Sequence, residues 1–444
     1  MTNCETANPN EDKIMKYEEL HLLFREMAAC NSAMNPLPAT LYFHTLMGAF
    51  FKNKSISWGI TNKDMRIHPF WVQDSRTGKG ALNKVLKIIV EAIGVSCVIE
   101  TDITDISSAL IGTYNHDNHK FNQDHGLSRI VPLIPKKGGK GAWEYKEPIE
   151  RGDLGTYDIV IIDEGKIFFQ SQNEKTLTVL QPALDFPGHV RKKMRGTTVI
   201  EYDCDATLVT TTIPFDQMKR SIIDQGFFQR SLLFIRRLSA SQIHQMRKEA
   251  RKLKNPEHRQ KFKTLLVQFK EKISKLNRDE EIIFVDDKAV GVLNKFSDEL
   301  FSTVQQRIVG PEAISILSFS QTFEDFSLKI AGHIALIEGR KIVTDKDIER
   351  TFYIAKNFFD TIINEIEVGI EKEEKEKYEK YFEFIKKVIV VGKAPIKLSD
   401  SVELVRKNFN VSASTARKKI EQLKDMNYIK FDDGNKFNTK YVNI

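Results

Sequence analysis

One stretch, residues 70–86, restricts the fold of this chain more than any other. It reads FWVQDSRTGKGALNKVL: an apolar strand end, a short polar loop carrying Gly78-Lys79-Gly80, and the start of a helix. In phosphate-binding loops, backbone N–H groups and a lysine surround the phosphates of a nucleotide. The order of strand, loop and helix therefore predicts such a loop, with Lys79 as its lysine.

The match to the loop pattern G-x-x-x-x-G-K-[S/T] is incomplete at two positions. Gln73 stands in place of the first glycine, and Gly80 stands where a hydroxyl would bind Mg²⁺. An ordinary glycine-containing turn could carry the same four residues Thr-Gly-Lys-Gly. The remainder of the chain has to decide between these two interpretations.

Size and composition predict a globular protein of two or three domains. The chain has 444 residues, of which 41% are hydrophobic and 29% are charged. No apolar run approaches the roughly 20 residues that span a membrane, and the N-terminus does not resemble a signal peptide. Cys4, Cys30, Cys97 and Cys204 are scattered, without a metal-binding or disulfide spacing. We expect a cytoplasmic protein with Cys97 and Cys204 in its core and no membrane partner.

The positive charge of the chain is concentrated near its C-terminus. The formal net charge is +7, and residues 386–444 hold 13 Lys/Arg against 6 Asp/Glu, which is the whole excess. A basic module on a neutral body indicates a polyanion partner, with DNA as the leading candidate. A solubilising basic tail is the alternative.

Continuous apolar strands separated by helices predict an α/β fold around a parallel sheet. The runs are residues 70–72, 96–100, 159–163, 206–212 and 231–235. We expect five segments: an N-terminal helical segment (1–66), an α/β core (67–240), a helical region (241–370), a charged helix or linker (371–383) and a C-terminal domain (384–444).

Two acidic residues follow the strand at residues 159–162. Asp163 and Glu164 would lie at its carboxyl end, where ligands gather in open α/β sheets. Asp163 is predicted to hold Mg²⁺, and Glu164 to polarise an attacking water. Simple capping of the strand before a turn is the alternative.

The C-terminal segment has a winged-helix pattern. Helices are expected at residues 378–388, 398–408 and 412–424, followed by a hairpin. In the third helix Ala416, Ile420 and Leu423 form an inward stripe. In a helix-turn-helix this helix enters the major groove, so Ser414, Arg417 and Lys418 are predicted DNA contacts, with Lys419 and Lys424 near phosphates. A protein-binding winged helix is the alternative.

Taken together, these motifs resemble the ATPase half of the minichromosome maintenance (MCM) replicative helicases and their viral and plasmid relatives. The family loop is matched at Asp74, Thr77 and Lys79, and the similarity in motif order extends over about residues 69–359. It implies an AAA+ P-loop ATPase core with an all-α lid, binding ATP and Mg²⁺. The loop residues implied to bind nucleotide are Asp74, Ser75, Arg76, Thr77, Gly78, Lys79, Gly80 and Ala81.

The resemblance also implies two DNA-contacting segments. Residues 114–145 would form the helix-2 insertion, with a basic tip at residues 136–140. A β-hairpin before the fourth core strand would contact single-stranded DNA. Its candidate phosphate contacts are Arg191, Lys192, Lys193 and Arg195. A solvated basic turn is the alternative for that hairpin.

Three further site residues follow from the resemblance. Thr212 would take the sensor-1 role, because Ile213 stands where the family has asparagine. Arg230 would be the arginine finger, acting on ATP bound by the next subunit. Lys329, in the expected lid, is the sensor-2 candidate.

The resemblance implies an ATP-dependent DNA helicase or translocase of replication, working as a homo-oligomeric ring, a hexamer in this family. A nucleotide-gated DNA-binding initiator or helicase-loading factor with little turnover is the alternative, prompted by Gly80. A transcription regulator is a third possibility. His116, His119 and His125 have a spacing compatible with zinc, but without cysteines nearby we expect no metal there.

Overall fold

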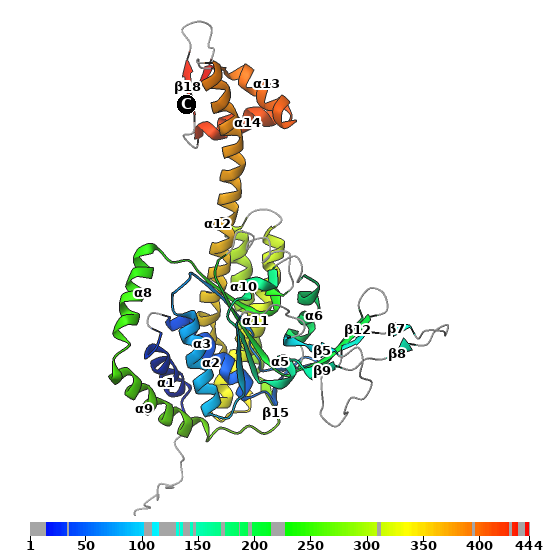
Figure 1. The fold of residues 1–444 in the computed structure, drawn as a ribbon, viewed down its shortest axis with the longest axis vertical. Coiled ribbons are helices and arrows are strands. Elements are labelled where there is room, and N and C mark those ends of the chain that lie inside the picture. Colours follow the sequence, from blue (N-terminus) through cyan, green and yellow to red (C-terminus); the bar gives the residue numbers. More distant parts are fainter. Residues whose placement is uncertain are drawn as a thin grey trace, which may run out of the picture. The chain divides into compact units, whose positions relative to one another are not determined.

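The chain folds into two compact units, residues 1–363 and 364–444 (Figure 1). The division falls inside one long helix, α12 (Asp345–Gly392), which includes the charged run at residues 371–380. The computed structural model describes residues 15–443 except 33–34, 102–108, 115–129, 133, 136–142, 145–147, 170–173, 186, 194–197, 215–226, 309–311, 393–395, 426–428 and 434–439.

A parallel sheet forms the centre of the first unit and confirms the predicted α/β architecture. Its strands are β3 (Pro69–Gln73), β4 (Cys97–Glu100), β10 (Ile159–Ile162), β13 (Thr207–Thr212) and β14 (Leu232–Arg236). Their order is β14-β3-β13-β10-β4, and every neighbouring pair is parallel. Strands β3, β10 and β13 are buried along their whole length, as expected where helices cover both faces. Their carboxyl ends therefore lie at one edge of the sheet, with β13 in the middle.

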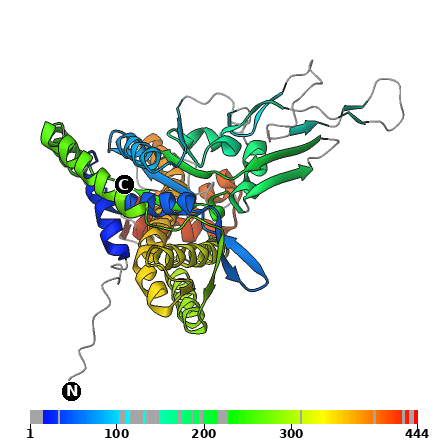
Figure 2. The same cartoon turned by 90° about the horizontal axis from the view of Figure 1, so that it is seen from below.

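Smaller antiparallel sheets lie outside the central sheet. Strands β11 (Gly188–Lys193) and β12 (Thr198–Cys204) form a hairpin, and β6 (Ile130–Pro132) pairs with β12. In Figure 2 these strands extend away from the central sheet. The predicted insertion therefore shares a sheet with the predicted basic hairpin. The remaining strands pair as β5 (Gly112–Tyr114) with β9 (Pro148–Arg151), and β7 (Ile134–Pro135) with β8 (Trp143–Glu144).

The N-terminal helices cover part of the central sheet. Helix α1 (Tyr17–Ala29) packs on α2 (Pro36–Phe50), and α2 contacts β3, β13 and α3 (Lys79–Ala92). Pro36 begins α2 at a position where its missing N–H costs nothing. The apolar side chains of these helices are mostly buried: Leu20, Met27, Leu41, Phe43 and Leu46 are almost fully inaccessible, whereas Leu22 is 55% exposed.

A second sheet was not expected, because residues 1–66 and 241–370 were described as helical. It has the order β16-β15-β1-β2, from β1 (Lys54–Trp58), β2 (Thr61–Asp64), β15 (Glu281–Val285) and β16 (Ile342–Val343). Lys54 donates to Glu281 over 2.9 Å, 227 residues later in the chain. These strands are short and held by pairing between distant segments, so local sequence periodicity does not reveal them.

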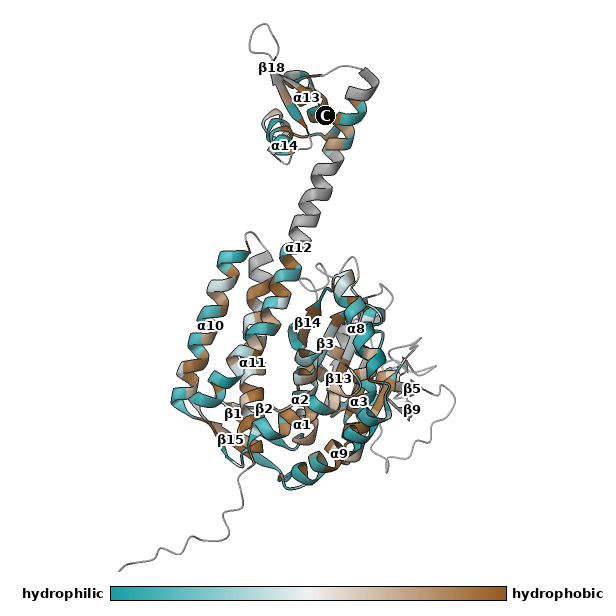
Figure 3. Cartoon of the chain, turned by 90° about the vertical axis from the view of Figure 1, so that its left-hand side faces the viewer, coloured by the Kyte–Doolittle hydropathy of each residue, from teal (hydrophilic) through white to brown (hydrophobic). Residues whose placement is uncertain are grey.

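Helices complete the first unit: α5 (Asp153–Thr156), α6 (Glu174–Asp185), α8 (Ala240–Lys252), α9 (Pro256–Ile273), α10 (Asp287–Arg307) and α11 (Glu312–Ile337), with 3₁₀ turns η2 (Gly165–Phe169) and η4 (Phe228–Arg230). Helix α8 starts with a capping box between Ser239 and Gln242, and Pro256 begins α9, as its position between two helical runs suggested. Helix α11 approaches the second sheet at Gly332, where a Cβ would lie 2.8 Å from Ile56. Figure 3 shows largely hydrophilic surfaces on α8 and α9.

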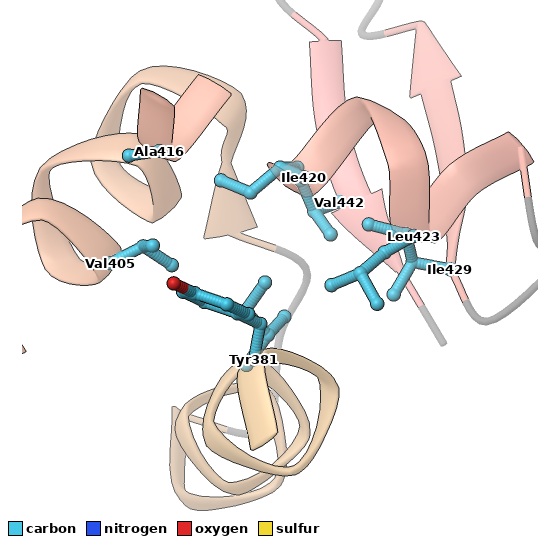
Figure 4. Packing of buried hydrophobic residues seen from close by; sticks show 8 residues of the cluster. Tyr381, Val405, Ala416, Ile420, Leu423, Ile429 and Val442 are labelled. Carbon is cyan, nitrogen blue, oxygen red and sulfur yellow. The ribbon is translucent and has the colours of Figure 1, made fainter. Parts of the chain in front are cut away.

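The second unit contains the helices and hairpin predicted for it. Helices α13 (Leu398–Phe409) and α14 (Ala413–Asp425) pack on each other, and strands β17 (Ile396–Lys397), β18 (Lys430–Asp433) and β19 (Lys440–Asn443) form a sheet of order β17-β19-β18. The stripe of Ala416, Ile420 and Leu423 is buried (Figure 4). The core of the second unit also contains Tyr381, Ile385, Val405, Ile429 and Val442.

None of the described helices is long and apolar enough to cross a membrane. Cys97 and Cys204 are buried, as expected, and so is Cys30.

Candidate functional site

The loop between β3 and α3 is closed around the side chain of Lys79. Gly78 has a φ of 92°, a left-handed conformation that favours glycine, and it caps the start of α3. Arg76 also has a positive φ, 59°. The Lys79 Nζ donates to the carbonyl of Gln73 at 2.5 Å and to that of Asp74 at 2.9 Å. The ammonium group therefore lies inside the loop, at the N-terminus of a helix, where anions bind.

Gln73, which replaces the first glycine of the loop pattern, holds the loop from beneath. Its side chain is fully buried, and its Nε2 donates to the carbonyl of Thr77 at 3.3 Å and to Asn35 at 3.2 Å. Asn35 in turn donates to the same Thr77 carbonyl at 2.9 Å. A buried amide whose hydrogen bonds are all made stabilises the structure around it. Glutamine in place of the first glycine is therefore compatible with a rigid loop.

Asp163 follows β10 and is fixed by two donors. Its Oδ1 accepts from Asn83 Nδ2 at 2.7 Å and from Thr211 Oγ1 at 2.7 Å, and Tyr42 donates to Asn83 Oδ1 at 2.6 Å. The other oxygen, Oδ2, faces Gly80, where a Cβ would lie 3.2 Å away. One carboxylate oxygen is thus anchored, and the other is turned towards the loop.

The loop and the acidic residues line one cavity of about 450 Å³, which we call the Lys79 cavity. It brings together residues from the ends of β3, β10 and β13, as the topology of the sheet requires. Of the predicted site residues it contains Ser75, Arg76, Thr77, Gly78, Lys79, Gly80, Ala81, Asp163, Glu164 and Thr212; Lys166 and Ile213 also line it.

Asp74 and Thr77 help to hold the loop in place, and only Thr77 of the two also lines the cavity. The Asp74 carboxylate accepts from the backbone N–H of Leu238 at 2.8 Å, and so ties the loop to the start of α8. The Thr77 hydroxyl donates to the Asp74 carbonyl at 2.5 Å. Thr212 lines the cavity and donates to the carbonyl of Ile213 at 3.4 Å.

Burial changes the acidity of the loop lysine. It lowers the pKa of Lys79 to about 8, although Asp163, Asp74 and Glu164 act in the opposite direction. Desolvation in the loop destabilises the charged ammonium form of Lys79. Binding of an anion beside this charge would therefore be favoured.

Arg230 and Lys329 do not line the Lys79 cavity. Both line a larger one of about 930 Å³, together with residues such as Lys54 and His68, and we call it the Arg230 cavity. Arg230 Nε donates to Asp185 at 2.6 Å.

Lys329 is buried at the base of the Arg230 cavity. Its Nζ donates to the carbonyl of Arg66 at 2.8 Å and lies 3.6 Å from Asp64. Burial lowers the pKa of Lys329, against the effect of Asp64. Burial opposes ionisation of Asp64 too, but Lys329, Arg66 and His68 outweigh it and lower its pKa to about 2. Lys329 thus belongs to a buried ion-pair network.

The two cavities lie at opposite edges of the central sheet. His68 and Arg230 precede β3 and β14, whereas the Lys79 loop follows β3. β3 pairs with β14 from Pro69 to Gln73, a length of about 13 Å along the strand. Arg230 is therefore placed away from the phosphate loop of its own chain.

The predicted DNA contacts are described only in part. Arg191, Lys192 and Lys193 lie in β11, paired with Glu201, Ile200 and Val199 of β12. Arg195, the tip at residues 136–140 and the three histidines His116, His119 and His125 lie outside the described residues. Within the residues that are described, no group of side chains has the arrangement of a metal site.

In the second unit the predicted DNA-facing residues lie on the surface. Ser414, Arg417 and Lys418 are exposed on α14. Arg417 pairs with Glu421 one turn later at 3.3 Å. Lys419 is half-buried, and the Lys424 ammonium lies over the Phe431 ring.

Sequence reasoning missed four residues that shape the site. Asn83, Thr211 and Tyr42 position Asp163, and Asn35 braces the loop. Asn83 carried a usable signal, because it lies four residues after Lys79 on the inward face of an amphipathic helix. The other three carried none, since their roles depend on contacts between distant segments.

No protein-family model matches this chain, and no curated protein matches it either. The function of the site is therefore inferred from its geometry.

Proposed function

We propose that the chain is an ATPase of the AAA+ class that acts on DNA, similar to MCM replicative helicases. The observation that carries the proposal is the meeting of Lys79 with Asp163 and Glu164 in one cavity at the carboxyl edge of a parallel sheet. An ordinary glycine turn would have no reason to lie beside two carboxylates from a strand two places away in the sheet. That arrangement supports the phosphate-loop interpretation of residues 70–86.

Each residue then has a role in phosphoryl transfer to water. The loop N–H groups and Lys79 would bind the phosphates, and Asp163 Oδ2 would face a bound Mg²⁺, which supplies charge neutralisation when present. Glu164 is exposed in the cavity and would orient the attacking water. Thr212, on the strand between them, would contact the terminal phosphate.

Arg230 would complete the site of a neighbouring copy. Since it lies at the opposite edge of the sheet from Lys79, it could neutralise transition-state charge only on a nucleotide bound by another subunit. This placement supports assembly into a homo-oligomeric ring, for which the family suggests a hexamer.

Two parts of the chain support DNA as the partner. The β11-β12-β6 sheet joins the predicted basic hairpin to the predicted insertion. The order of helices and the three-stranded sheet of the second unit are compatible with a winged helix, and basic residues are exposed on α14. A helicase or translocase would use the first for single strands and the second for duplex DNA.

Gly80 favours a second candidate, a nucleotide-gated DNA-binding initiator or helicase-loading factor with slow turnover. It removes a hydroxyl ligand of Mg²⁺ next to Asp163 Oδ2, and the Thr77 hydroxyl is already engaged with the Asp74 carbonyl. An initiator or loading factor of this kind would bind ATP but hydrolyse it slowly.

Nucleotide binding by the Lys79→Ala variant tests the site. Removing charge-assisted hydrogen bonds worth about 2 to 3 kcal/mol should weaken binding of a fluorescent ATP analogue by roughly 30- to 150-fold. Lys84→Ala removes an exposed lysine from the same helix and should bind normally. Unchanged binding by Lys79→Ala would refute the site. Steady-state hydrolysis with and without single-stranded DNA then separates the two candidate functions.

A further inference from the structure

The region between β14 and β15 carries a hidden charge excess. Residues 240–280 contain 12 Lys/Arg against 5 Asp/Glu, a net charge of +7, equal to that of residues 386–444. The rest of the chain, without residues 240–280 and 386–444, holds 42 Lys/Arg against 49 Asp/Glu. The charge outside the C-terminal segment is therefore balanced only because a basic part and an acidic part cancel. The basic part comprises α8 and α9, which we call the basic helix pair.

Most of these cations have no carboxylate partner. Lys252, Lys261 and Lys272 pair with Glu249, Glu26 and Glu19 at 2.9 to 3.2 Å. Among the residues that the structure describes, the other nine cations have no carboxylate within 4.0 Å. Their side chains are almost all exposed, so each would gain from an anion brought by a partner.

The unpaired cations form two stripes. Arg247 and Arg251 are spaced i, i+4 on one face of α8, and Lys254 lies in the turn that follows the helix. On α9, Arg259, Lys263 and Lys270 are spaced i, i+4, i+11, again one face, over about 16 Å. In Figure 3 much of the ribbon of α8 and α9 has the colour of hydrophilic residues.

The stripe on α8 reaches the phosphate loop. Together with Arg76 it lines a cavity of about 400 Å³, whose other lining residues include Ser32, Thr77, Gly78 and Ala81. This cavity contains four cationic side chains and no carboxylate, whereas the Lys79 cavity has two carboxylates and the Arg230 cavity has four. The chemistry of the surface is thus that of an anion site.

The apolar side of the basic helix pair is already occupied. Leu265, Phe269 and Ile273 are buried, α9 packs on α1, and Phe269 lies 6.2 Å from Phe24. A helix that binds a membrane surface needs its apolar face free, so membrane binding is excluded here. Val267 is the only large hydrophobic residue exposed on the pair. An acidic protein partner would be expected to find an apolar or aromatic centre, which this surface lacks.

We propose that the basic helix pair binds the phosphate backbone of single-stranded nucleic acid, independently of base sequence. Lysine and arginine side chains without fixed partners suit phosphates, whose binding releases counterions and depends steeply on salt. The site is separate from the β11 hairpin and from α14. It lies beside the nucleotide loop, through Arg76.

The test measures salt dependence of binding by the full chain, without nucleotide, so that its outcome does not depend on the ATPase proposal. The probe is a fluorescent 30-nucleotide thymidine oligomer. The first variant is Arg259→Gln/Lys263→Gln/Lys270→Gln on α9, and the second is Arg247→Gln/Arg251→Gln/Lys254→Gln on α8 and the turn after it. The control Lys288→Gln/Lys295→Gln/Lys346→Gln removes three exposed lysines from α10 and α12.

Each stripe variant should bind about tenfold more weakly, and the slope of log K against log salt should fall by about 2, because three phosphate contacts each contribute about 0.7. The control should keep the wild-type slope. Slopes equal to the control for both stripe variants would overturn the proposal. Displacement of the oligomer by polyglutamate as readily as by unlabelled DNA would overturn it as well, because the surface would then accept any polyanion.

Discussion

The Lys79 cavity and the Arg230 cavity lie at opposite edges of the same sheet and gather different side chains. Under the proposed function, the first would supply the phosphate loop, the carboxylate that faces Mg²⁺ and the acid that orients water, while Arg230 of the same chain is at the far edge. The second gathers Arg230, Lys329 and three further lysines, but no phosphate loop. Under the proposed function, a single chain would bind nucleotide, and hydrolysis would need a second copy.

The largest expected effect separates the two cavities by function. Arg230→Ala should lower the rate of ATP hydrolysis by about 10³-fold, because an arginine finger stabilises transition-state charge, and it should leave ATP affinity nearly unchanged. Steady-state hydrolysis and binding of a fluorescent ATP analogue measure both. Lys52→Ala, in the same cavity, is the control and should hydrolyse ATP normally. Hydrolysis at the wild-type rate by Arg230→Ala would contradict the separate roles of the two cavities.

A pH titration examines the Lys79 cavity alone. The pKa of Lys79 is about 8, so the lysine is charged below that pH and neutral above it. ATP affinity should hold up to about pH 8 and then fall by up to tenfold per pH unit, since phosphates lose their cation. Lys79→Arg stays charged throughout and should be insensitive over pH 7 to 9.5. Equal pH dependence in the two proteins would show that Lys79 does not contact phosphate.

Asn83→Ala tests whether the orientation of Asp163 matters. Loss of one hydrogen bond to Oδ1 should raise the Mg²⁺ concentration needed for half-maximal hydrolysis by about tenfold, without altering Mg²⁺-free nucleotide binding. Tyr42→Phe removes only the hydroxyl behind Asn83 and should have a smaller effect. The Mg²⁺ dependence of hydrolysis measures both, and an unchanged dependence in Asn83→Ala would leave Asp163 without this positioning role.

The smallest expected effect concerns Gly80. Gly80→Ser restores a hydroxyl beside Asp163 Oδ2 and should raise hydrolysis roughly threefold, provided that the carboxylate yields a few tenths of an ångström to the new Cβ. Gly80→Ala adds the same Cβ without the hydroxyl and should not raise it. A serine variant no faster than the alanine variant would mean that Mg²⁺ is already fully coordinated.

The features that depend on local sequence pattern could be predicted from the sequence. Continuous apolar runs predicted all five strands of the central sheet. The strand-loop-helix order of residues 70–86 predicted the position of Lys79 in a loop after β3. The end of the apolar run at β10 predicted Asp163 and Glu164 at the same edge of the sheet. The stripe of Ala416, Ile420 and Leu423 located the core of the second unit.

What the sequence did not predict depends on contacts between distant segments. The second sheet needs β1 beside β15, and the bracing of the loop needs Asn35 beside Gln73. The sequence also did not predict the partners of Lys329, which lies against Asp64 and the Arg66 carbonyl in the Arg230 cavity. Charge balance summed over long ranges also concealed the basic helix pair.

Mixing two inactive variants tests the central claim most directly. Lys79→Ala has a defective phosphate loop and an intact Arg230, whereas Arg230→Ala has the reverse. If the cavities of neighbouring copies form one site, an interface that pairs the intact loop of Arg230→Ala with the intact arginine of Lys79→Ala is complete. Steady-state ATP hydrolysis by the mixture should then exceed that of either variant alone. A mixture no more active than its separate components would contradict a site shared between copies.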